Sequence, residues 1–328
     1  MSEVGRITQL WRFPVKSMAG ERLTAVEVNA LGMHADRTWA VRDLKLGATT
    51  GAKRLPSLLQ CSARYAAPPP PDAGPGKAPE VIVSFPDGTE LSSSDPKVHD
   101  ALSSYLDREV ELRPLPPLTA KAEYRGPLMT KADIRTIMGL EDEDPLPDMS
   151  MFPVSKLAEL TRYATPVGTY ADAYPLHLLS EHSLRTMAAL APGSNFDVRR
   201  FRPGVLVETP DTAEDYPEWK WCGGMLQTPG AQLQPLFPTI RCSMPTREQG
   251  ELAEDRDVIR TISAHANRCL GVYLDVPHPG RLAEGDALTF ERAGRVPLGA
   301  RPDALASRVK RAVMKAGTVA MPRGKPRN

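Results

Sequence analysis

Cysteine is scarce in this chain: there are four in 328 residues, and they are far apart in the sequence. They form no C-x-x-C pair and no short cluster with histidine, so their spacing predicts no structural zinc site. Four scattered cysteines in a chain of this length also do not match a disulfide framework. We therefore expect free thiols, and a reducing, cytoplasmic setting, for Cys61, Cys222, Cys242 and Cys269.

An excess of charge of one sign and long apolar runs are also missing. The 41 Lys and Arg residues face 40 Asp and Glu residues, and the net charge of +1 gives no electrostatic indication of a nucleic-acid partner. No segment approaches the roughly 18–20 apolar residues of a membrane helix, and Arg6 and Arg12 interrupt what could be a signal peptide. The motifs G-x-G-x-x-G, Walker A, G-x-S-x-G and H-E-x-x-H do not occur. We expect no nucleic-acid partner and no membrane association.

What the sequence does contain is typical of a β-rich globular protein. Hydrophobic residues make up 41% and charged residues 25% of the chain. Short apolar segments between Pro and Gly turns predict a barrel or sandwich. The predicted strands are 4–11, 23–28, 36–43, 81–85, 89–91, 109–113, 205–208, 219–222, 271–276 and 287–290. Asp95 and Ser180 are predicted to cap helices over 95–106 and 181–191, and a third helix is predicted over 257–266.

Three segments suggest how the chain is divided. Residues 114–153 are predicted to be irregular, with a solvated acidic patch, and residues 279–286 to form a double turn. We place a domain boundary in the irregular segment, which gives domains over 1–120 and 121–291. The remaining tail, 292–328, is basic and predicts an amphipathic helix over 303–315. Such a helix binds acidic surfaces or packs on its own domain.

The stretch from 195 to 250 has the clearest chemical content, and its centre is Cys242. Arg199, Arg200 and Arg202 precede a β-type apolar run, and Arg241 stands next to the cysteine. A neighbouring cation favours the thiolate, which makes a cysteine a better nucleophile and a better ligand for a soft metal. Arginines near a loop also suit an anion such as phosphate. A lone cysteine in an apolar stretch is more often a small buried residue, so that reading stays open.

A set of short motifs, each weak alone, occurs in an order that resembles the MOSC superfamily. The resemblance is to its two-part members with an N-terminal β-barrel domain, a group that includes the mitochondrial amidoxime-reducing component and bacterial relatives. It covers roughly residues 4 to 291. The motifs are Phe13-Pro14-Val15-Lys16-Ser17 with Gly20, Gly32 with Asp36-Arg37-Thr38-Trp39, Ala52-Lys53 with Pro56, Asp172 with Pro175 and Leu179-Ser180-Glu181, Phe201-Arg202-Pro203, Arg241-Cys242, and Pro279-Gly280 with Gly285-Asp286.

The resemblance implies a mixed α/β, β-rich fold, in which a MOSC-type N-terminal β-barrel domain precedes a MOSC β-barrel with flanking helices. It also implies a molybdenum cofactor, Mo-molybdopterin, ligated by Cys242. Asp172 then matches an acidic residue near the metal, where it could relay a proton. The residues that match cofactor-binding positions are Lys16, Ser17, Arg37, Lys53, Arg202 and Arg241. Lys53 replaces an Arg of relatives, which keeps the charge but loses the bidentate fork.

Departures from the family pattern leave three functions open. Thr239 and Ile240 stand where relatives often have a second Cys or a Ser, and Gly204 replaces an Asn. The leading hypothesis is a reductase that removes oxygen from an N-hydroxylated small-molecule substrate, with electrons from a separate reductase, because no flavin, haem or iron–sulfur motif appears. The second is a sulfurtransferase that carries persulfide sulfur on Cys242, supplied by a sulfur donor protein. The third is a non-catalytic cofactor carrier.

Overall fold

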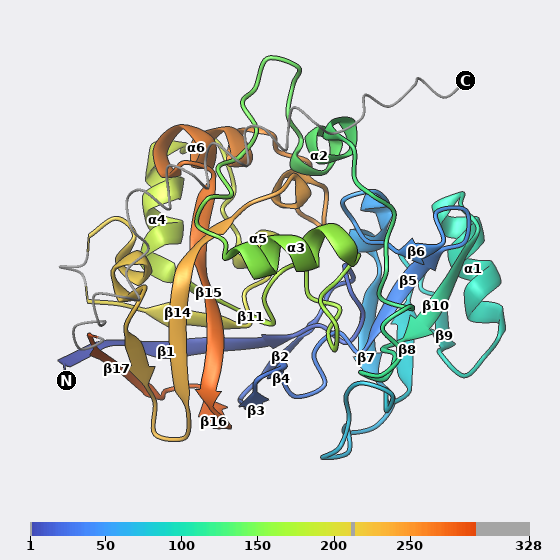
Figure 1. Ribbon diagram of the computed structural model, residues 1–328, viewed down its shortest axis with the longest axis horizontal. Helices are drawn as coiled ribbons and strands as arrows, with labels where there is room; N and C mark the ends of the chain where they lie inside the picture. Colours follow the sequence, from blue (N-terminus) through green and yellow to red (C-terminus); the bar gives the residue numbers. More distant parts are fainter. Residues whose placement is uncertain (1, 211–213, 293–328) are drawn as a thin grey trace.

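The computed structural model describes residues 2–210 and 214–292, and its main feature is a closed β-barrel (Figure 1). Among these residues, seven strands follow one another around the barrel, and all neighbours are antiparallel except the parallel pair β11 and β12. In order around the ring they are β1 (Ser2–Arg12), β12 (Val205–Glu208), β11 (Leu176–Ser180), β15 (Cys269–His278), β14 (Gln232–Ile240), β13 (Met225–Gln227) and β17 (Ala287–Glu291).

Strand β1 closes the ring because it pairs with β12 on one edge and with β17 on the other. Its inward side chains fill the barrel: Ile7 and Leu10 are 1% and 0% exposed. Register shifts on both edges mark bulges, which bend a strand and increase its twist. Gly5 lets β12 approach closely, since a Cβ atom there would lie 2.4 Å from the carbonyl oxygen of Glu208. The glycine and the bulges together allow one strand to serve both edges.

Strands from both ends of the chain lie beside the barrel. β2 (Glu21–Leu23) continues the sheet from β1, while β3 (Ala25–Asn29) pairs with β4 (Gly32–Met33) and with β16 (Gly280–Ala283). Side chains of β3 and β16 join the barrel interior in one apolar core. The N-terminal and C-terminal parts are therefore joined by backbone pairing, and the division at residue 120 stays a prediction.

The N-terminal part has its own core beside the barrel, visible at the right of Figure 1. Two three-stranded sheets, one helix and one 3-10 turn surround it. The elements are β5 (Trp39–Asp43), β6 (Ala48–Thr49) and β10 (Val110–Pro114), then β7 (Ser62–Tyr65), β8 (Val81–Ser84) and β9 (Glu90–Ser92), with η1 (Pro56–Gln60) and α1 (Lys97–Leu106). Val81, Val83 and Leu102 are fully buried here, as expected of the alternating face of a strand and the apolar face of a helix.

Helices α4 (Glu181–Leu190), α5 (Val198–Phe201) and α6 (Asp257–Ala266) pack against the outside of the barrel in a further apolar core. Ser180 caps α4 as predicted, because its Oγ accepts a hydrogen bond from the Ser183 backbone N–H at 3.0 Å. None of the helices in the described part of the chain combines the length and the apolar character needed to cross a membrane. These elements confirm the predicted β-rich, mixed α/β fold with a barrel and flanking helices.

Several local predictions are wrong. The predicted strand at 219–222 is the 3-10 helix η2 (Pro217–Trp221), which begins at a proline that cannot donate to a sheet. The segment 114–153 is not wholly irregular, because it contains α2 (Lys131–Met138). The double turn at 279–286 contains β16, and the strand at 23–28 is divided between β2 and β3. Strands β13 and β14 and helix α3 (Val154–Arg162) were not predicted. The predicted tail helix lies outside the described residues.

Truncation of a barrel side chain is expected to destabilise the fold. Leu178 on β11 is fully buried, whereas Leu190 at the end of α4 is 44% exposed. We expect Leu178→Ala to lower the free energy of unfolding by about 2–5 kcal/mol, through lost apolar transfer and the cavity left behind. The matched change Leu190→Ala should cost no more than about 0.5 kcal/mol. Urea denaturation measures both, and equal losses would show that the barrel interior is not the main core.

Candidate cofactor site

Cys242 stands where β14 leaves the barrel. The strand ends at Ile240, and the 3-10 helix η3 (Met244–Thr246) begins two residues after the cysteine. The chain is fixed at this point by reciprocal bonds: the Arg241 N–H donates to the Arg268 carbonyl at 2.9 Å, and the Arg268 Nε donates to the Arg241 carbonyl at 3.1 Å. Cys242 itself is a free, half-buried thiol. It is therefore neither sealed in the apolar core nor fully open to solvent.

Asp172 is held between two lysines that come from different loops. Lys16 Nζ lies 2.5 Å from Asp172 Oδ1, and Lys53 Nζ lies 2.9 Å from Asp172 Oδ2. Lys16 also donates to the Tyr170 carbonyl at 2.7 Å. Burial would raise the pKa of the Asp172 carboxyl, but the two ammonium charges outweigh burial and hold that pKa well below its usual range. Asp172 is therefore a carboxylate at neutral pH.

The two lysines respond differently to this shared partner. Burial, together with the neighbouring charges of Lys53 and Arg37, lowers the pKa of the Lys16 amine more than Asp172 raises it. Burial also opposes the charge of Lys53, but Asp172 and Cys242 together outweigh it and raise the pKa of Lys53. Because Cys242 contributes to the raised pKa of Lys53, we assign the cysteine to the same site as the carboxylate and the two lysines.

Arg37 and Arg202 lie against the same aromatic ring. Their guanidinium carbons are 5.0 Å and 4.0 Å from the centre of the Phe13 ring, and both residues have left-handed backbones, with φ of 50° and 51°. Arg37 pairs with Asp36, whereas Arg202 has no ion pair in the described chain. Burial, and then the neighbouring Arg37 charge, lower the pKa of Arg202. The charge of Arg202 is thus costly unless an anion comes close.

Three buried guanidinium atoms lack acceptors within the described residues: Nη2 of Arg202, Nε of Arg241 and, outside the predicted site residues, Nε of Arg247. Arg241 is otherwise held by the bond from its Nη2 to the Phe201 carbonyl at 2.8 Å. Burial and the Arg241 charge hold the pKa of His177 well below its usual range, so this neighbouring ring is neutral and adds no charge. A buried donor without an acceptor costs free energy. Arg202 and Arg241 are therefore suited to an anionic ligand such as a phosphate.

Ser17 follows Lys16 and is bonded to the loop that carries Lys53. Its Oγ accepts a hydrogen bond from the Ala52 N–H at 2.9 Å, and its φ is 70°. A Cβ atom on Gly51 would lie 2.5 Å from this oxygen, so a glycine is needed for the approach. Ser17 joins the loop of Lys16 to the loop of Lys53, and its hydroxyl proton and second lone pair remain for a ligand.

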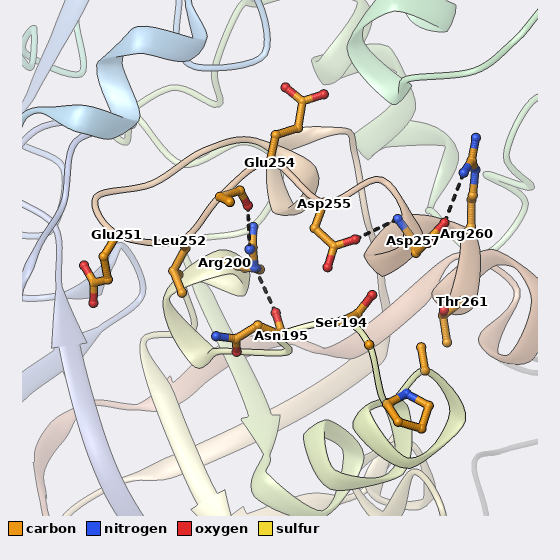
Figure 2. Close-up of a pocket in the computed structure, with 14 residues that line it drawn as sticks. Ser194, Asn195, Arg200, Glu251, Leu252, Glu254, Asp255, Asp257, Arg260 and Thr261 are labelled. Carbon is orange, nitrogen blue, oxygen red and sulfur yellow. Dashed lines mark hydrogen bonds and ion pairs between the residues drawn. The ribbon is translucent and has the colours of Figure 1, made fainter.

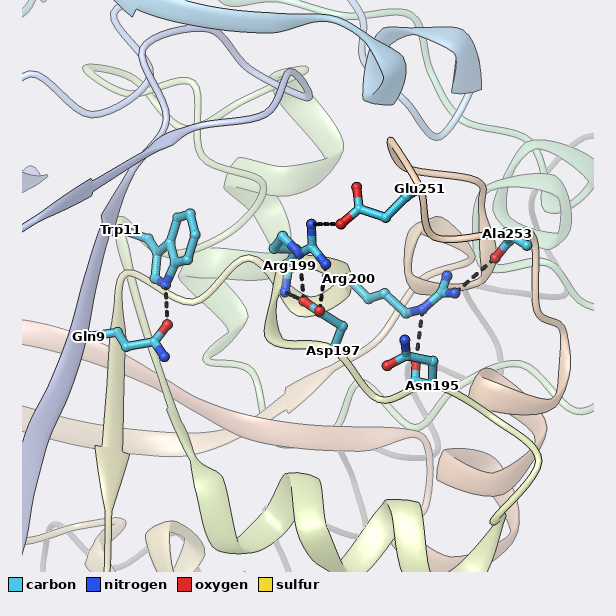
Figure 3. Close-up of polar contacts among 8 residues, drawn as sticks. All are labelled: Gln9, Trp11, Asn195, Asp197, Arg199, Arg200, Glu251 and Ala253. Carbon is cyan, nitrogen blue, oxygen red and sulfur yellow. Dashed lines mark hydrogen bonds and ion pairs between the residues drawn. The ribbon is translucent and has the colours of Figure 1, made fainter.

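Arg199 and Arg200 lie outside this site, although they precede Arg202 in the same basic run. Arg199 pairs with Asp197 at 2.7 Å and with Glu251 at 2.5 Å on the surface. Arg200 is buried, and Figure 3 shows its guanidinium directed to the carbonyl oxygens of Asn195 and Ala253. It also donates to the carbonyls of Pro245 and Arg247, at 3.1 Å and 3.2 Å. Arg200 thus stabilises the loop after Cys242.

Sequence reasoning did not single out Arg268 and Tyr273. The charge of the Cys242 sulfur acts to raise the pKa of both side chains, so we assign both to its surroundings. They belong to the turn before β15 and to β15 itself, which is the neighbour of the cysteine-bearing strand. Their positions follow from strand pairing across the barrel, and no local motif could have indicated them.

The site therefore combines one thiol, one carboxylate between two lysines, and three arginines. Within the described residues, no group of three or more His, Cys, Asp or Glu side chains could hold a metal by itself. A metal beside Cys242 would thus need ligands from a bound group, and the buried cations fit an anionic group. These residues fit a phosphate-bearing cofactor whose metal takes one protein thiolate.

Comparisons with known proteins give the family. The model for the MOSC domain matches residues 166–289, and that for the MOSC N-terminal beta barrel domain matches residues 4–105. Among solved structures, the YUAD protein from Bacillus subtilis is 11% identical, with a TM-score of 0.38 over 89% of this chain and 97% of its own. YiiM from Geobacillus stearothermophilus is 14% identical, with a TM-score of 0.29 over 42% of this chain and 70% of its own. No curated protein matches. The two family matches, in their order along the chain, show that it belongs to the MOSC superfamily, with a MOSC domain preceded by a MOSC N-terminal β-barrel domain.

Proposed function

We propose that this protein is a molybdenum-cofactor-dependent reductase of N-hydroxylated substrates, such as amidoximes or hydroxylamines. MOSC domains are associated with binding of the molybdenum cofactor or with carrying sulfur. The observation that carries the proposal is a half-buried thiol in a cluster of cations that includes two buried guanidinium groups with free donors. A cofactor that brings both a soft metal and a phosphate would meet both features.

The residues of the site would have different roles in holding the cofactor. Cys242 would supply the thiolate ligand to molybdenum, and Arg202 and Arg241 would donate their unpartnered N–H groups to the anionic part of the cofactor. Arg37 would add charge beside the Phe13 ring. Lys16, Ser17 and Lys53 come from two joined loops, so they would hold the cofactor from one side.

When bound, the cofactor supplies two-electron oxo transfer. The overall reaction takes an N-hydroxylated compound, two electrons and two protons to the reduced nitrogen compound and water. Asp172 holds Lys16 and Lys53 in place, and Lys16 donates a hydrogen bond to Asp172. Because burial lowers the pKa of Lys16, this pair is suited to pass a proton toward the leaving oxygen. The electrons would come from a separate reductase.

Replacement of the thiol tests the metal ligand. We expect Cys242→Ser, made in a host that synthesises the cofactor, to lose most of its molybdenum, because an alcohol is a much poorer soft-metal ligand than a thiolate. The control is Cys222→Ser, which changes another half-buried thiol outside the site. Elemental analysis by mass spectrometry gives the metal content per chain. Full molybdenum content in Cys242→Ser would contradict the assignment of Cys242 as the metal ligand.

Arginine replacements test the anion site. We expect Arg202→Ala to retain roughly ten- to a hundredfold less pterin, the loss that follows from a charged hydrogen bond worth about 1.5–3 kcal/mol. Arg199→Ala removes an arginine three positions away that pairs at the surface, and it should retain pterin as the parent does. The measurement is fluorescence of the oxidised pterin released from the protein. Equal retention in both variants would contradict the assignment of Arg202, provided that both unfold at the parental temperature.

The same cationic site also supports a second candidate, a sulfurtransferase with a persulfide on Cys242. The cations near the thiol, Lys53, Arg241 and Arg268, would stabilise a persulfide anion as well as a thiolate. For this function we expect cyanide-labile sulfur near one atom per chain in metal-free protein, lost in Cys242→Ser and kept in Cys222→Ser. Release of thiocyanate on cyanide treatment measures it. Absence of labile sulfur after incubation with a sulfur donor protein would exclude this candidate.

A further inference from the structure

Helix α2 (Lys131–Met138) lies between the loop that carries Cys242 and the loop that carries Lys53. It belongs to the segment that joins the N-terminal part to the barrel, and Figure 1 shows it between α6 and the N-terminal sheets. Neither the sequence motifs nor the proposed chemistry uses this helix. Its polar contacts nevertheless reach the immediate neighbours of both Cys242 and Lys53.

The C-terminal end of α2 is bonded directly to Ser243 and, through Arg268, to Arg241, the two neighbours of Cys242. The Ile137 carbonyl accepts from the Ser243 N–H at 3.1 Å and from the Ser243 Oγ at 2.9 Å. The Met138 carbonyl accepts from the Arg268 guanidinium, which in turn donates to the Arg241 carbonyl. The last turn of α2 therefore lies directly beside the backbone that carries the thiol.

The N-terminal end of α2 is bonded to the loop of Lys53. Arg54 Nη2 lies 3.1 Å from Asp133 Oδ1. The other oxygen of Asp133 accepts from the N–H and the Oγ of Thr130, which completes a capping box at the start of the helix. Asp133 thus caps the first turn of α2 and also forms, with Arg54, the only described ion pair between α2 and the N-terminal part.

Little else in α2 itself fixes its position. None of its eight residues is buried. An isolated helix of this length is not stable in water, and elements with few buried apolar contacts open at low free-energy cost. The place of α2 therefore depends on the polar contacts at its two ends.

We propose that α2 is a strap beside Cys242, and that Arg54 is the positioning residue that holds it closed through Asp133. When closed, the strap limits access to the thiol and fixes the Cys242 loop relative to the Lys53 loop. When open, it exposes the site for loading of a bulky ligand. The inference rests on the proposed function only in taking Cys242 as the working thiol.

The test measures access to Cys242 by alkylation with iodoacetamide. The full chain is produced in a host that does not make the molybdenum cofactor, so the result does not depend on metal binding. Cys222 is also half-buried and serves as an internal reference in the same molecule. Peptide mass spectrometry gives the alkylation rate of Cys242 relative to that of Cys222.

We expect Arg54→Ala to raise this rate ratio about two- to fivefold, the range for loss of a partly exposed ion pair. Arg54→Lys keeps a charge opposite Asp133 and should restore a ratio close to that of the parent. Arg64→Ala is the matched control, since it removes an ion pair of 3.0 Å with Glu90 elsewhere in the N-terminal part. It should leave the ratio unchanged.

Thr130→Ala gives an independent second variant, because it removes the capping box and leaves Arg54 in place. It should also raise the ratio. An unchanged ratio in both Arg54→Ala and Thr130→Ala would overturn the strap. Retention of molybdenum by Cys242→Ser would instead contradict the assignment of Cys242 as metal ligand, without affecting the alkylation result. Failure of the proposed function and failure of the strap proposal are therefore distinguishable.

Discussion

Positive charge that is buried without an acceptor is the constraint on which this molecule depends. Arg202 reaches the site from the end of α5 and Arg241 from the end of β14, and each keeps one buried N–H group unpartnered in the described chain. Asp172 is shared between Lys16 and Lys53, so it cannot also neutralise the arginines. Desolvated cations cost free energy that an anionic ligand recovers on binding. The same buried arginines therefore lower the stability of the ligand-free fold and raise its affinity for an anion.

The large features of the fold were predictable because they rest on local patterns. The short apolar segment that predicts β1, the turn between β8 and β9, and the Ser180 cap of α4 each depend on residues close together in the sequence. The elements that were not predicted depend instead on partners far away in the sequence. β14 contains Pro235 and Pro238, which argue against a strand, yet its bulged pairing with β15 accommodates them. β16 pairs with β3, which is far away in the sequence, so no local pattern indicates this strand.

The site was predictable in part for a similar reason. The motif with Lys16 and the position of Cys242 could be recognised from the order of short segments, and the structure brings Lys16, Lys53 and Asp172 together. The difference between Arg200 and Arg202 could not be recognised, since both stand in one basic run. Arg202 ends α5 in a left-handed conformation that turns its side chain toward Phe13, whereas Arg200 remains in the helix and binds loop carbonyls. The residues that line a groove of about 690 Å³ beside Arg200 include Glu251, Glu254, Asp255 and Asp257 but not Cys242 (Figure 2).

The pairing of Ser2 with Phe290 has a consequence for how the chain folds during synthesis. On the ribosome, β1 emerges first and must wait for β17, the last strand of the barrel, before both of its edges are satisfied. Pairings so distant in sequence slow folding, and a waiting strand edge invites association with other chains. The nascent N-terminal strand is therefore the part of this protein for which protection by a chaperone would matter most.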